Sequence, residues 1–525
     1  MEKWLRGTVA VLASMAMGNV MAQALPAELQ ALDATVEQVR GQFQVPGIAV
    51  AVVKDGQVVM ARGWGVREQG KPAPVDADTL FAIASNTKAM TATALSVLAQ
   101  EGKLSLDDKV IDHLPWFRMG DAYVTREMTL RDLLVHRSGL GLGAGDLLFW
   151  PTTDYSTREV VQRLANVPLS GGFRERYAYD NILYGVAQLV IEEVSGQSFA
   201  DFLQQRIFTP AGMAGTRFNA DHLQRGDKAA VGHALYDWKE LRTVAPLTWH
   251  NNSAAGGVYS SVNDMARWMN VQLAGGRLPG GDARLFDDKR QQQMWSVVTP
   301  QAVAEPAVPE LAPMKPNFAG YGEGWSLSDY RGQKLVWHTG GWPGMVSRVT
   351  LVPEQKLGIV VLTNQEVGAA FNAITYSVLD AMLGAPAHDW VDAYAKAVAK
   401  GRSNADEQWD KHVAARVAGS TPSLALAGYA ATYRDRWYGD VIVEQQGDAL
   451  RLRFSRTPML VGTLEHWQHD TFIVRWDDRS LNADAFVNFA LDVDGKVSSA
   501  RMQAVSSLTD FSFDFQDLDL RRQQP

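Results

Sequence analysis

The segment FAIASNTKAMTATALSVLAQEG, residues 81–102, carries a Ser-x-x-Lys motif at the start of a predicted core helix. From Thr87 to Gln100 the residues are almost all apolar or small, and a glycine follows at Gly102. This pattern predicts a buried helix that ends at a C′ glycine. Residues i and i+3 share a helical face, so the Lys88 amine can reach the Ser85 hydroxyl. Burial and the helix N-terminus are both expected to lower the pKa of Lys88, which favours its action as a base for a serine nucleophile.

Two further motifs follow in the chain. Tyr179-Asp180-Asn181 is its only Tyr-x-Asn, and His338-Thr339-Gly340 is its only His-Thr-Gly or Lys-Thr-Gly. Each has a structural alternative: Ser-x-x-Lys arises by chance, Tyr179 could be a core tyrosine, and His338 could be a strand histidine. The three motifs together, each with a suitable flanking pattern, favour an acyl-transfer site.

The order of these motifs resembles the serine β-lactamase and penicillin-binding-protein superfamily, specifically its class C-like β-lactamase-related serine hydrolases (peptidase family S12). The resemblance spans about residues 30–385 and includes TLRDLLVHRSGL at 129–140, AAGGVYSSVNDMARWM at 254–269 and LVPEQKLGIVVLTN at 351–364. It implies an α+β fold, with a β-lactamase/DD-peptidase-like antiparallel sheet flanked by helices, and a helical subdomain.

The chemistry of acyl transfer assigns a role to each candidate residue. Ser85 is the expected nucleophile, Lys88 its base, and Tyr179 the group that returns a proton to the leaving group. The Asn181 amide can both donate to a substrate carbonyl and accept from an amine. The resemblance implies that the Gly341 amide pairs with the Ser85 amide as an oxyanion hole, a role that requires two donors. The predicted substrate-binding and oxyanion residues are Asn181, His338, Thr339, Gly340 and Gly341.

Two departures from the family pattern bear on the substrate. Penicillin-hydrolysing relatives usually carry Lys where this chain has His338, whose mostly neutral imidazole predicts weaker, pH-dependent anion binding. The stretch 365–374, QEVGAAFNAI, also lacks the Pro and Arg of class C β-lactamases. Hydrolysis of amides, esters or D-amino-acid-containing small peptides is therefore the favoured prediction. A β-lactamase or penicillin-binding protein, and a non-catalytic ligand-binding or sensor protein on a hydrolase scaffold, remain as alternatives.

The first 24 residues have the pattern of a secretory signal peptide. Lys3 and Arg6 form a basic start, an apolar run follows, and Ala22-Gln23-Ala24 matches a cleavage site. The apolar run is shorter than a membrane span and contains Gly18 and Asn19. We therefore expect a periplasmic or secreted enzyme with no membrane span after cleavage. The chain has no cysteine, so it forms no disulfide.

The composition is that of a globular protein of more than one domain. The chain has 525 residues, of which 46% are hydrophobic and 21% charged, with a formal net charge of −8. Length predicts at least two domains, and mild acidity argues against nucleic acid as a partner. The predicted partner is a small-molecule or short-peptide substrate. No cofactor or metal is predicted, and the oligomeric state stays open.

The predicted domains are a signal peptide at 1–24, a hydrolase domain at 25–385, a helical linker at 386–423 and a barrel at 424–525. The hydrolase domain is expected to open with a hairpin at 47–65 and to contain a long loop at 282–318. Short alternating segments, TDFSFDF at 509–515 among them, predict a small C-terminal antiparallel β-barrel. It resembles the lipocalin-like domains of D-aminopeptidase-like relatives. Because the candidate residues all precede it, truncation after about Gly419 is expected to leave turnover of a small ester intact.

Overall fold

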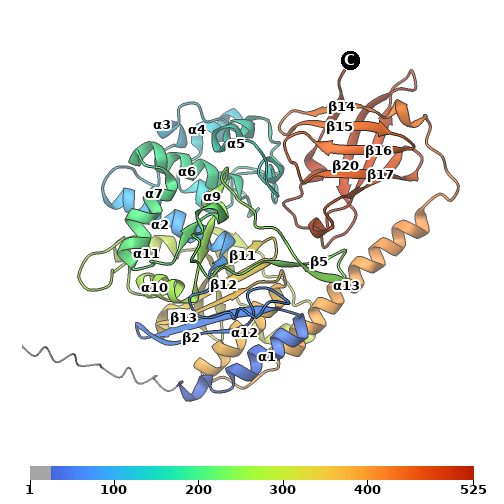
Figure 1. Ribbon diagram of the computed structural model, residues 1–525. Helices are drawn as coiled ribbons and strands as arrows, with labels where there is room; N and C mark the ends of the chain where they lie inside the picture. Colours follow the sequence, from blue (N-terminus) through green and yellow to red (C-terminus); the bar gives the residue numbers. More distant parts are fainter. Residues whose placement is uncertain (1–24, 525) are drawn as a thin grey trace, which may run out of the picture.

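The structure, a computed structural model, describes residues 25–524 of the chain. Figure 1 shows the predicted hydrolase domain, a long helix that leaves it and a separate barrel at the C-terminal end. The predicted signal peptide lies outside the described residues. No helix within residues 25–524 is long and apolar enough to cross a membrane.

A central antiparallel sheet organises the hydrolase domain. Its strand order is β2-β1-β13-β12-β11-β10-β9-β8. The strands are β1 (Gly47–Lys54), β2 (Gln57–Gly65), β8 (Thr299–Gln301), β9 (Ala319–Tyr321), β10 (Ser326–Tyr330), β11 (Gln333–Trp342), β12 (Met345–Val352) and β13 (Leu357–Thr363). The predicted first hairpin is confirmed: β1 and β2 pair around Asp55-Gly56, both with positive φ, as a tight hairpin turn requires.

Both faces of the sheet are covered, which explains why β1 is buried along almost its whole length. Ala49, Ala51 and Val53 point into one core, and Ile48, Val50 and Val52 point into the other. This alternation follows from the two-residue period of a strand. The first core is shared with α2 (Thr87–Gln100) and α10 (Val262–Leu273), and the second with α1 (Leu32–Phe43) and α12 (Gly368–Met382).

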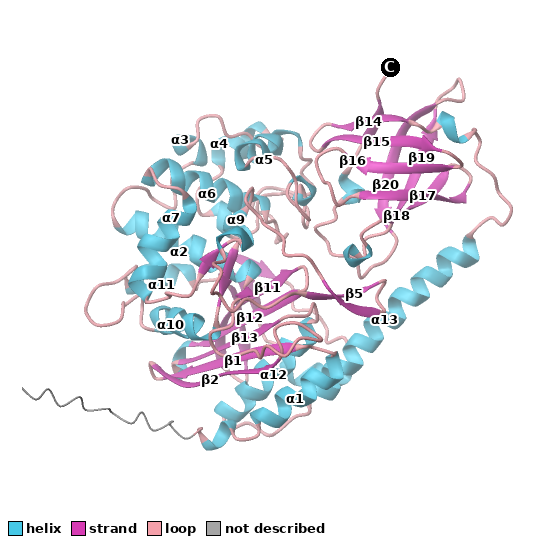
Figure 2. Ribbon diagram, in the orientation of Figure 1, coloured by secondary structure: helices cyan, strands magenta, loops and turns pink. Residues whose placement is uncertain are grey.

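Further helices form the subdomain beside the sheet (Figure 2). They are α3 (Val110–His113), α4 (Ala122–Glu127), α5 (Thr157–Arg163), α6 (Ile182–Ser195), α7 (Phe199–Leu203), α8 (Thr209–Ala211), α9 (Ser253–Gly256) and α11 (Asp288–Met294). Short strands lie among them: β3 (Phe81–Ala82), β4 (Arg217–Phe218) and β7 (Val258–Ser260) pair in one sheet, and β5 (His233–Tyr236) and β6 (Glu240–Thr243) form a hairpin.

The long loop predicted at 282–318 is only partly correct, because this segment contains α11 and β8. The Asp287 side chain accepts from the Arg290 amide at 2.7 Å and so caps α11. This N-cap is a local signal that hydrophobic periodicity does not reveal. The strand β8 is an edge strand of the central sheet, and Gln301 is its last residue.

A 26-residue helix, α13 (Trp390–Ala415), leads from the hydrolase domain to the barrel. Its first turns are buried through Trp390, Val391 and Tyr394, whereas its later turns are mostly exposed. The barrel is closed and antiparallel, as the sequence predicts. Its strands are β14 (Ala431–Asp435), β15 (Gly439–Gln446), β16 (Ala449–Phe454), β17 (Val461–Gln468), β18 (Thr471–Trp476), β19 (Ala485–Leu491), β20 (Val497–Ala504) and β21 (Leu520–Arg522).

The segment TDFSFDF forms no strand, so that prediction is wrong. It belongs to the loop between β20 and β21, residues 505–519, which we call the barrel loop. The Asp510 carboxylate accepts from the Ser512 amide at 2.8 Å, which closes a local turn. The carboxylate of Asp514 binds amides of the hydrolase domain instead of continuing a ladder. In this loop, the carboxylates of Asp510 and Asp514 accept hydrogen bonds from backbone amides, in place of bonds between strands.

Candidate active site

The Ser85 hydroxyl and the Lys88 amine meet at the start of α2. Ser85 lies in the 3-10 turn Ala84–Asn86, and Lys88 Nζ is 3.0 Å from Ser85 Oγ. Lys88 also donates to Asn181 Oδ1 at 2.7 Å and to the Ala255 carbonyl at 2.9 Å. A neutral amine has two N–H donors and one lone pair. If the two carbonyl oxygens accept the hydrogens, the lone pair is left for the Ser85 hydroxyl, as a general base requires.

Burial favours the uncharged form of the Lys88 amine. Its side chain is fully enclosed, and desolvation lowers the pKa of Lys88 to about 7, although Asp146 and Asp180 oppose this shift. Burial also raises the pKa of Asp146 to about 8. An ammonium in this position costs more free energy than a free amine. A large fraction of the base is therefore ready to accept a proton at neutral pH.

A strained turn and a glycine bring the Ser85 turn and β11 together. Ala84 has a φ of 46°, a left-handed value that is uncommon for alanine and that recurs at functional sites. A Cβ on Gly340 would collide with the Ile83 carbonyl and the Ser347 hydroxyl. Gly340, a predicted substrate-binding residue, is therefore packed against the turn and does not line the pocket. Its lack of a side chain lets the strand approach the nucleophile.

Tyr179 and Asn181 reach the site from the segment before α6. The Tyr179 ring centroid is 4.8 Å from Lys88 Nζ. Burial raises the pKa of Tyr179 well above its ordinary value, with a hydrogen bond to Ser85 opposing the shift. The phenol is therefore protonated at neutral pH and can give a proton to a leaving group. Asn181 links Lys88 to a residue that sequence reasoning missed, because its Nδ2 donates to Asp146 Oδ2 at 2.7 Å.

His338 lies within β11 and is held as a neutral imidazole. Its Nδ1 is 2.6 Å from the Thr339 carbonyl, and its Nε2 is 2.8 Å from the Tyr321 hydroxyl. A carbonyl can only accept, so Nδ1 carries the proton and Nε2 accepts from Tyr321. Burial, and then the nearby Lys88, lower the pKa of His338 to about 3. The predicted pH-dependent anion binding at His338 is therefore wrong, because the ring does not become charged near neutral pH.

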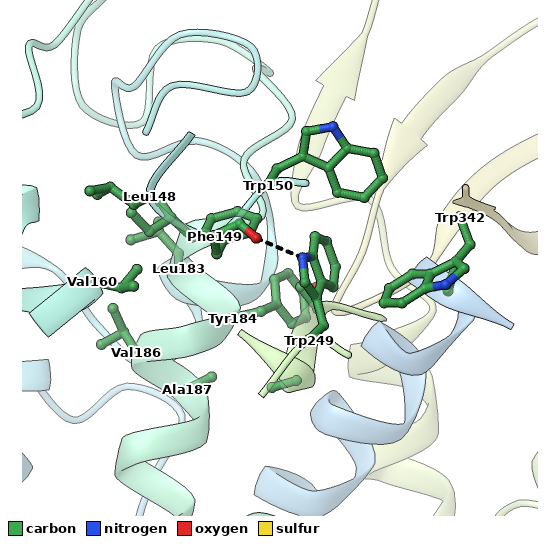
Figure 3. Packing of buried hydrophobic residues seen from close by; sticks show 14 of the residues in the cluster. Leu148, Phe149, Trp150, Val160, Leu183, Tyr184, Val186, Ala187, Trp249 and Trp342 are labelled. Carbon is green, nitrogen blue, oxygen red and sulfur yellow. Dashed lines mark hydrogen bonds between the residues drawn. The ribbon is translucent and has the colours of Figure 1, made fainter. Parts of the chain in front are cut away.

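The catalytic pocket, a cavity of about 310 Å³, brings most of the predicted residues together. Its lining contains the predicted residues Ser85, Tyr179, Asn181, His338, Thr339 and Gly341. Trp150 and Trp249 form part of its wall, with ring centroids 5.5 Å apart. Figure 3 shows them beside Trp342, where the Trp249 indole donates to the Phe149 carbonyl at 3.0 Å. Among residues 25–524, no group of three or more His, Cys, Asp or Glu side chains could hold a metal ion.

The barrel loop also enters this site. The Ser512 hydroxyl donates to Asp146 Oδ2 at 2.8 Å, beside the bond from Asn181. The Asp514 carboxylate accepts from the amides of Gly145 at 2.7 Å and Leu147 at 3.1 Å. The loop thus holds the turn that carries Asp146, which in turn orients Asn181 and Lys88. The expectation that the first domain alone supports the site is corrected accordingly.

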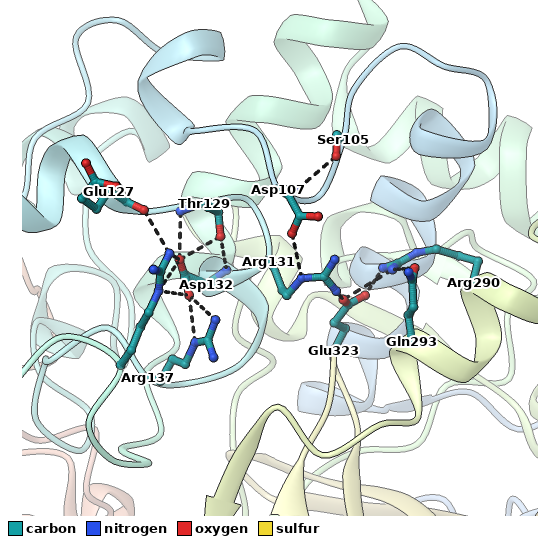
Figure 4. Close-up of polar contacts among 11 residues, drawn as sticks. Ser105, Asp107, Glu127, Thr129, Arg131, Asp132, Arg137, Arg290, Gln293 and Glu323 are labelled. Carbon is teal, nitrogen blue, oxygen red and sulfur yellow. Dashed lines mark hydrogen bonds and ion pairs between the residues drawn. The ribbon is translucent and has the colours of Figure 1, made fainter.

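Buried ion pairs hold α2 and its neighbouring loops (Figure 4). The Glu323 carboxylate pairs with both Arg131 and Arg290, and Arg290 Nε donates to Ser96 on α2 at 3.0 Å. Asp132 is likewise enclosed and pairs with Arg137 and Arg174. These groups do not line the catalytic pocket. Removing one partner of a buried pair such as Glu323–Arg290 costs about 3–5 kcal/mol, and through Ser96 this pair supports the helix that carries Lys88.

Asp146→Asn is expected to shift the pH profile of kcat/KM to lower pH. Activity requires the free amine of Lys88, so in the wild type it rises with pH around the Lys88 pKa of about 7. Asp146 raises that pKa to the extent that it is ionised, which is only in part because its own pKa is about 8, and an amide removes this charge while retaining an acceptor for Asn181. The Lys88 pKa should therefore fall. The profile is measured with a p-nitrophenyl ester, and Asp477→Asn, an exposed barrel residue, is the control. An unchanged midpoint, or one at higher pH, would contradict the coupling.

Comparisons with known proteins agree with this architecture. The Beta-lactamase family matches residues 32–382, and a domain of unknown function, DUF3471, matches residues 415–522. The Unguisins hydrolase ungD of Aspergillus violaceofuscus is 27% identical over 482 residues, which cover 82% of this chain and 80% of that protein. Protein flp of Staphylococcus aureus is 26% identical over 336 residues, which cover 64% of this chain and 62% of that protein.

Solved structures show the same fold. An octameric penicillin-binding protein homologue from Pyrococcus abyssi has a TM-score of 0.57 at 21% identity, with 93% of this chain and 98% of that chain covered. The D-amino acid amidase of Ochrobactrum anthropi SV3 has a TM-score of 0.56 at 23% identity, with 67% and 99% covered. Fold and site together define a serine hydrolase of the β-lactamase fold. The chain belongs to the Beta-lactamase family, whose match spans the domain that carries Ser85 and Lys88.

Proposed function

We propose that this protein hydrolyses amide or ester bonds in small molecules or short peptides whose reacting residue carries a free amino group. The bond would be cleaved through an acyl-enzyme on Ser85. The observation that carries this proposal is the charge of the catalytic pocket: Asp510 lines it, and no Lys or Arg is among the described residues of its lining. This activity would be aminopeptidase-like or amidase-like, and it would place the protein among the peptidases of family S12.

Asp510 has the properties of a site for an ammonium group. Its side chain keeps accessible surface because it faces the cavity, yet the surrounding protein raises the pKa of its carboxyl. It forms no ion pair with any residue in 25–524. An ammonium group placed beside it would stabilise the carboxylate and lower this pKa. A substrate carboxylate would be repelled by Asp510, and His338 offers it no charge because its imidazole is neutral.

The residues of the site can be assigned to successive steps of hydrolysis. Ser85 attacks the substrate carbonyl while its proton moves to Lys88, and this proton is then passed from Lys88 through the Tyr179 hydroxyl to the leaving amine or alcohol, so that Lys88 is neutral again. The backbone amides of Ser85 and Gly341 are proposed to stabilise the oxyanion. Water then attacks the acyl-enzyme while its proton moves to Lys88, and Lys88 returns this proton to Ser85 Oγ as the acid product leaves. Asn181 keeps the Lys88 amine oriented throughout, through the bond between its Oδ1 and Lys88 Nζ.

The structural neighbours give partial support for amino-acid substrates. The Ochrobactrum amidase is described in complex with D-phenylalanine and also with L-phenylalanine. D-Amino-acid substrates are therefore part of the proposal, and both enantiomers belong in the assay. We also propose that the protein acts in the periplasm or outside the cell, on the basis of its N-terminal sequence.

Two alternative functions are less well supported by the site. A β-lactamase or penicillin-binding protein must hold the carboxylate of its substrate, and the described lining of the pocket offers no cation for it. A non-catalytic binding or sensor protein would not need a desolvated lysine 3.0 Å from a serine hydroxyl. A chromogenic cephalosporin tests the first alternative, and turnover of any amide or ester tests the second.

Asp510→Asn is expected to abolish the preference for amine-bearing substrates. Phenylalanine p-nitroanilide and its amine-free counterpart, 3-phenylpropionyl p-nitroanilide, differ only in the amino group. The variant should lose about 30-fold or more in kcat/KM for the first, because the carboxylate that would pair with the ammonium group is removed, and little for the second. Asp477→Asn serves as the control. Equal losses for both anilides, or a wild type that does not distinguish them, would refute the ammonium site.

A further inference from the structure

A second cavity of about 340 Å³ lies beyond the catalytic pocket, between the hydrolase domain and the barrel. The two cavities share Trp150, Gly341 and Asp510 in their linings. A Cβ on Gly341 would meet no atom within 4 Å, so the space beside this residue is open. A molecule attached to Ser85 could therefore extend past Gly341 into the second cavity, which we call the interdomain cavity.

The walls of the interdomain cavity are mainly apolar and come from both domains. The hydrolase domain contributes Trp150, Trp342 and Leu247, and the barrel contributes Met459, Leu481 and Phe513. Trp150 and Trp342 are buried against the core, so their positions are fixed by packing. Pockets that bind organic ligands typically combine such apolar walls with a few placed polar groups.

The polar part of the interdomain cavity is acidic. Glu366 projects into it and accepts from the Gly344 amide at 2.5 Å. The Glu366 side chain keeps accessible surface, but the protein around its carboxyl, and then the nearby Asp510, raise its pKa to about 7. No Lys or Arg appears among the described residues that line it. The cavity therefore suits an apolar group whose polar end is a cation or a hydrogen-bond donor, and disfavours an anion.

Contacts between the domains define the shape of the cavity. The β5–β6 hairpin reaches the barrel, where Asn482 Nδ2 donates to the Leu235 carbonyl at 2.7 Å. The Trp238 amide donates to Asn482 Oδ1 at 3.2 Å, and Arg479 pairs with Asp237. Figure 1 shows β5 extending from the hydrolase domain towards α13 and the barrel. The barrel thus closes one side of the cavity through specific contacts.

We propose that the interdomain cavity binds a large apolar side chain on the acyl part of the substrate, such as an aromatic or long aliphatic group. This inference deepens the proposed function and rests on its acyl-enzyme at Ser85. An amino group and a side chain on the same carbon lie within a few bonds of each other. If Asp510 at the junction holds the amino group, the side chain next to it enters the cavity beyond. The barrel then selects substrates by the size of this side chain.

The test compares amine-free p-nitrophenyl esters, so that it does not depend on the ammonium site. For the wild type, kcat/KM for the 3-phenylpropionate ester should exceed that for the acetate by at least about tenfold, after correction for alkaline hydrolysis rates. Leu481→Trp should fill the cavity and lower kcat/KM for the 3-phenylpropionate by about 10- to 100-fold, with less than about threefold change for the acetate. Leu481→Ala should keep or raise activity towards bulkier acyl groups.

The control places the same substitution elsewhere on the barrel. Val493 is fully exposed, so Val493→Trp should change neither ester. Each variant is first checked for a cooperative thermal transition. The inference is overturned if Leu481→Trp affects both esters equally, affects neither, or slows only substrates with bulky leaving groups. Failure of the amine preference with retention of the size preference would refute the proposed ammonium site alone.

Discussion

Lys88→Met is expected to lower kcat for p-nitrophenyl acetate by about 10²- to 10⁴-fold, the range that general-base catalysis supplies. The amine is 3.0 Å from the Ser85 hydroxyl, and Met replaces it with an apolar group on a stem of similar length. The substitution leaves Asn181 Oδ1 and the Ala255 carbonyl without this donor, but it also removes a buried amine. The protein should therefore fold. Initial rates and thermal unfolding are measured on the same preparation.

A matched substitution shows whether the loss is specific to the base. Lys109→Met removes a partly exposed lysine that pairs with Glu127 outside the site, and it should keep near-wild-type kcat. If Lys88→Met also keeps its activity, the assignment of Ser85 and Lys88 is wrong. Two other buried serines, Ser138 and Ser253, would then need testing.

Asp514→Asn in the barrel loop is expected to lower kcat by about 100-fold for small and large substrates alike. The Asp514 carboxylate accepts from the amides of Gly145 and Leu147, and an Asn would bring an N–H group against one of them. The turn that carries Asp146 should shift, and a displacement of about 1 Å at a catalytic group lowers the rate by about 100-fold. Ser512→Ala removes one bond to Asp146 and should have a smaller effect in the same direction.

This result would distinguish support of the catalytic geometry by the barrel loop from a role of the barrel in substrate selection alone. If the barrel loop served only specificity, Asp514→Asn would change KM for large substrates and leave kcat for p-nitrophenyl acetate near the wild-type value. Asp477→Asn, on the barrel surface, controls for loss of a barrel carboxylate. Wild-type kcat for the acetate in the Asp514 variant would show that the loop does not support the catalytic geometry.

Local patterns were sufficient for the elements that position the nucleophile. The apolar run from Thr87 to Gln100 predicted α2, and the i, i+3 spacing predicted the approach of Lys88 to Ser85, because both depend on helical geometry alone. The Asp55-Gly56 turn predicted the first hairpin for the same reason. Alternating segments predicted the barrel, since each of its strands carries its own two-residue pattern.

The contributions of distant residues could not be predicted from such patterns. Asp146 and Ser512 are 366 positions apart and meet only because the barrel packs on the hydrolase domain. His338 was expected to titrate near neutral pH, and only its burial and its bond from Tyr321 reveal that it stays neutral. The segment TDFSFDF has strand-like alternation, but its polar side chains bind donors in a loop. Tertiary contacts decide each of these cases.

The central claim is that Ser85, activated by Lys88, forms the acyl-enzyme, and intact-mass measurement with a fluorophosphonate tests it most directly. The account predicts one adduct per wild-type chain, located on the peptide that contains Ser85, and no adduct on Ser85→Ala under the same conditions. Lys88→Met should be labelled much more slowly, because its serine has lost the base. Stoichiometric labelling of Ser85→Ala, or no adduct on the wild type, would contradict the account.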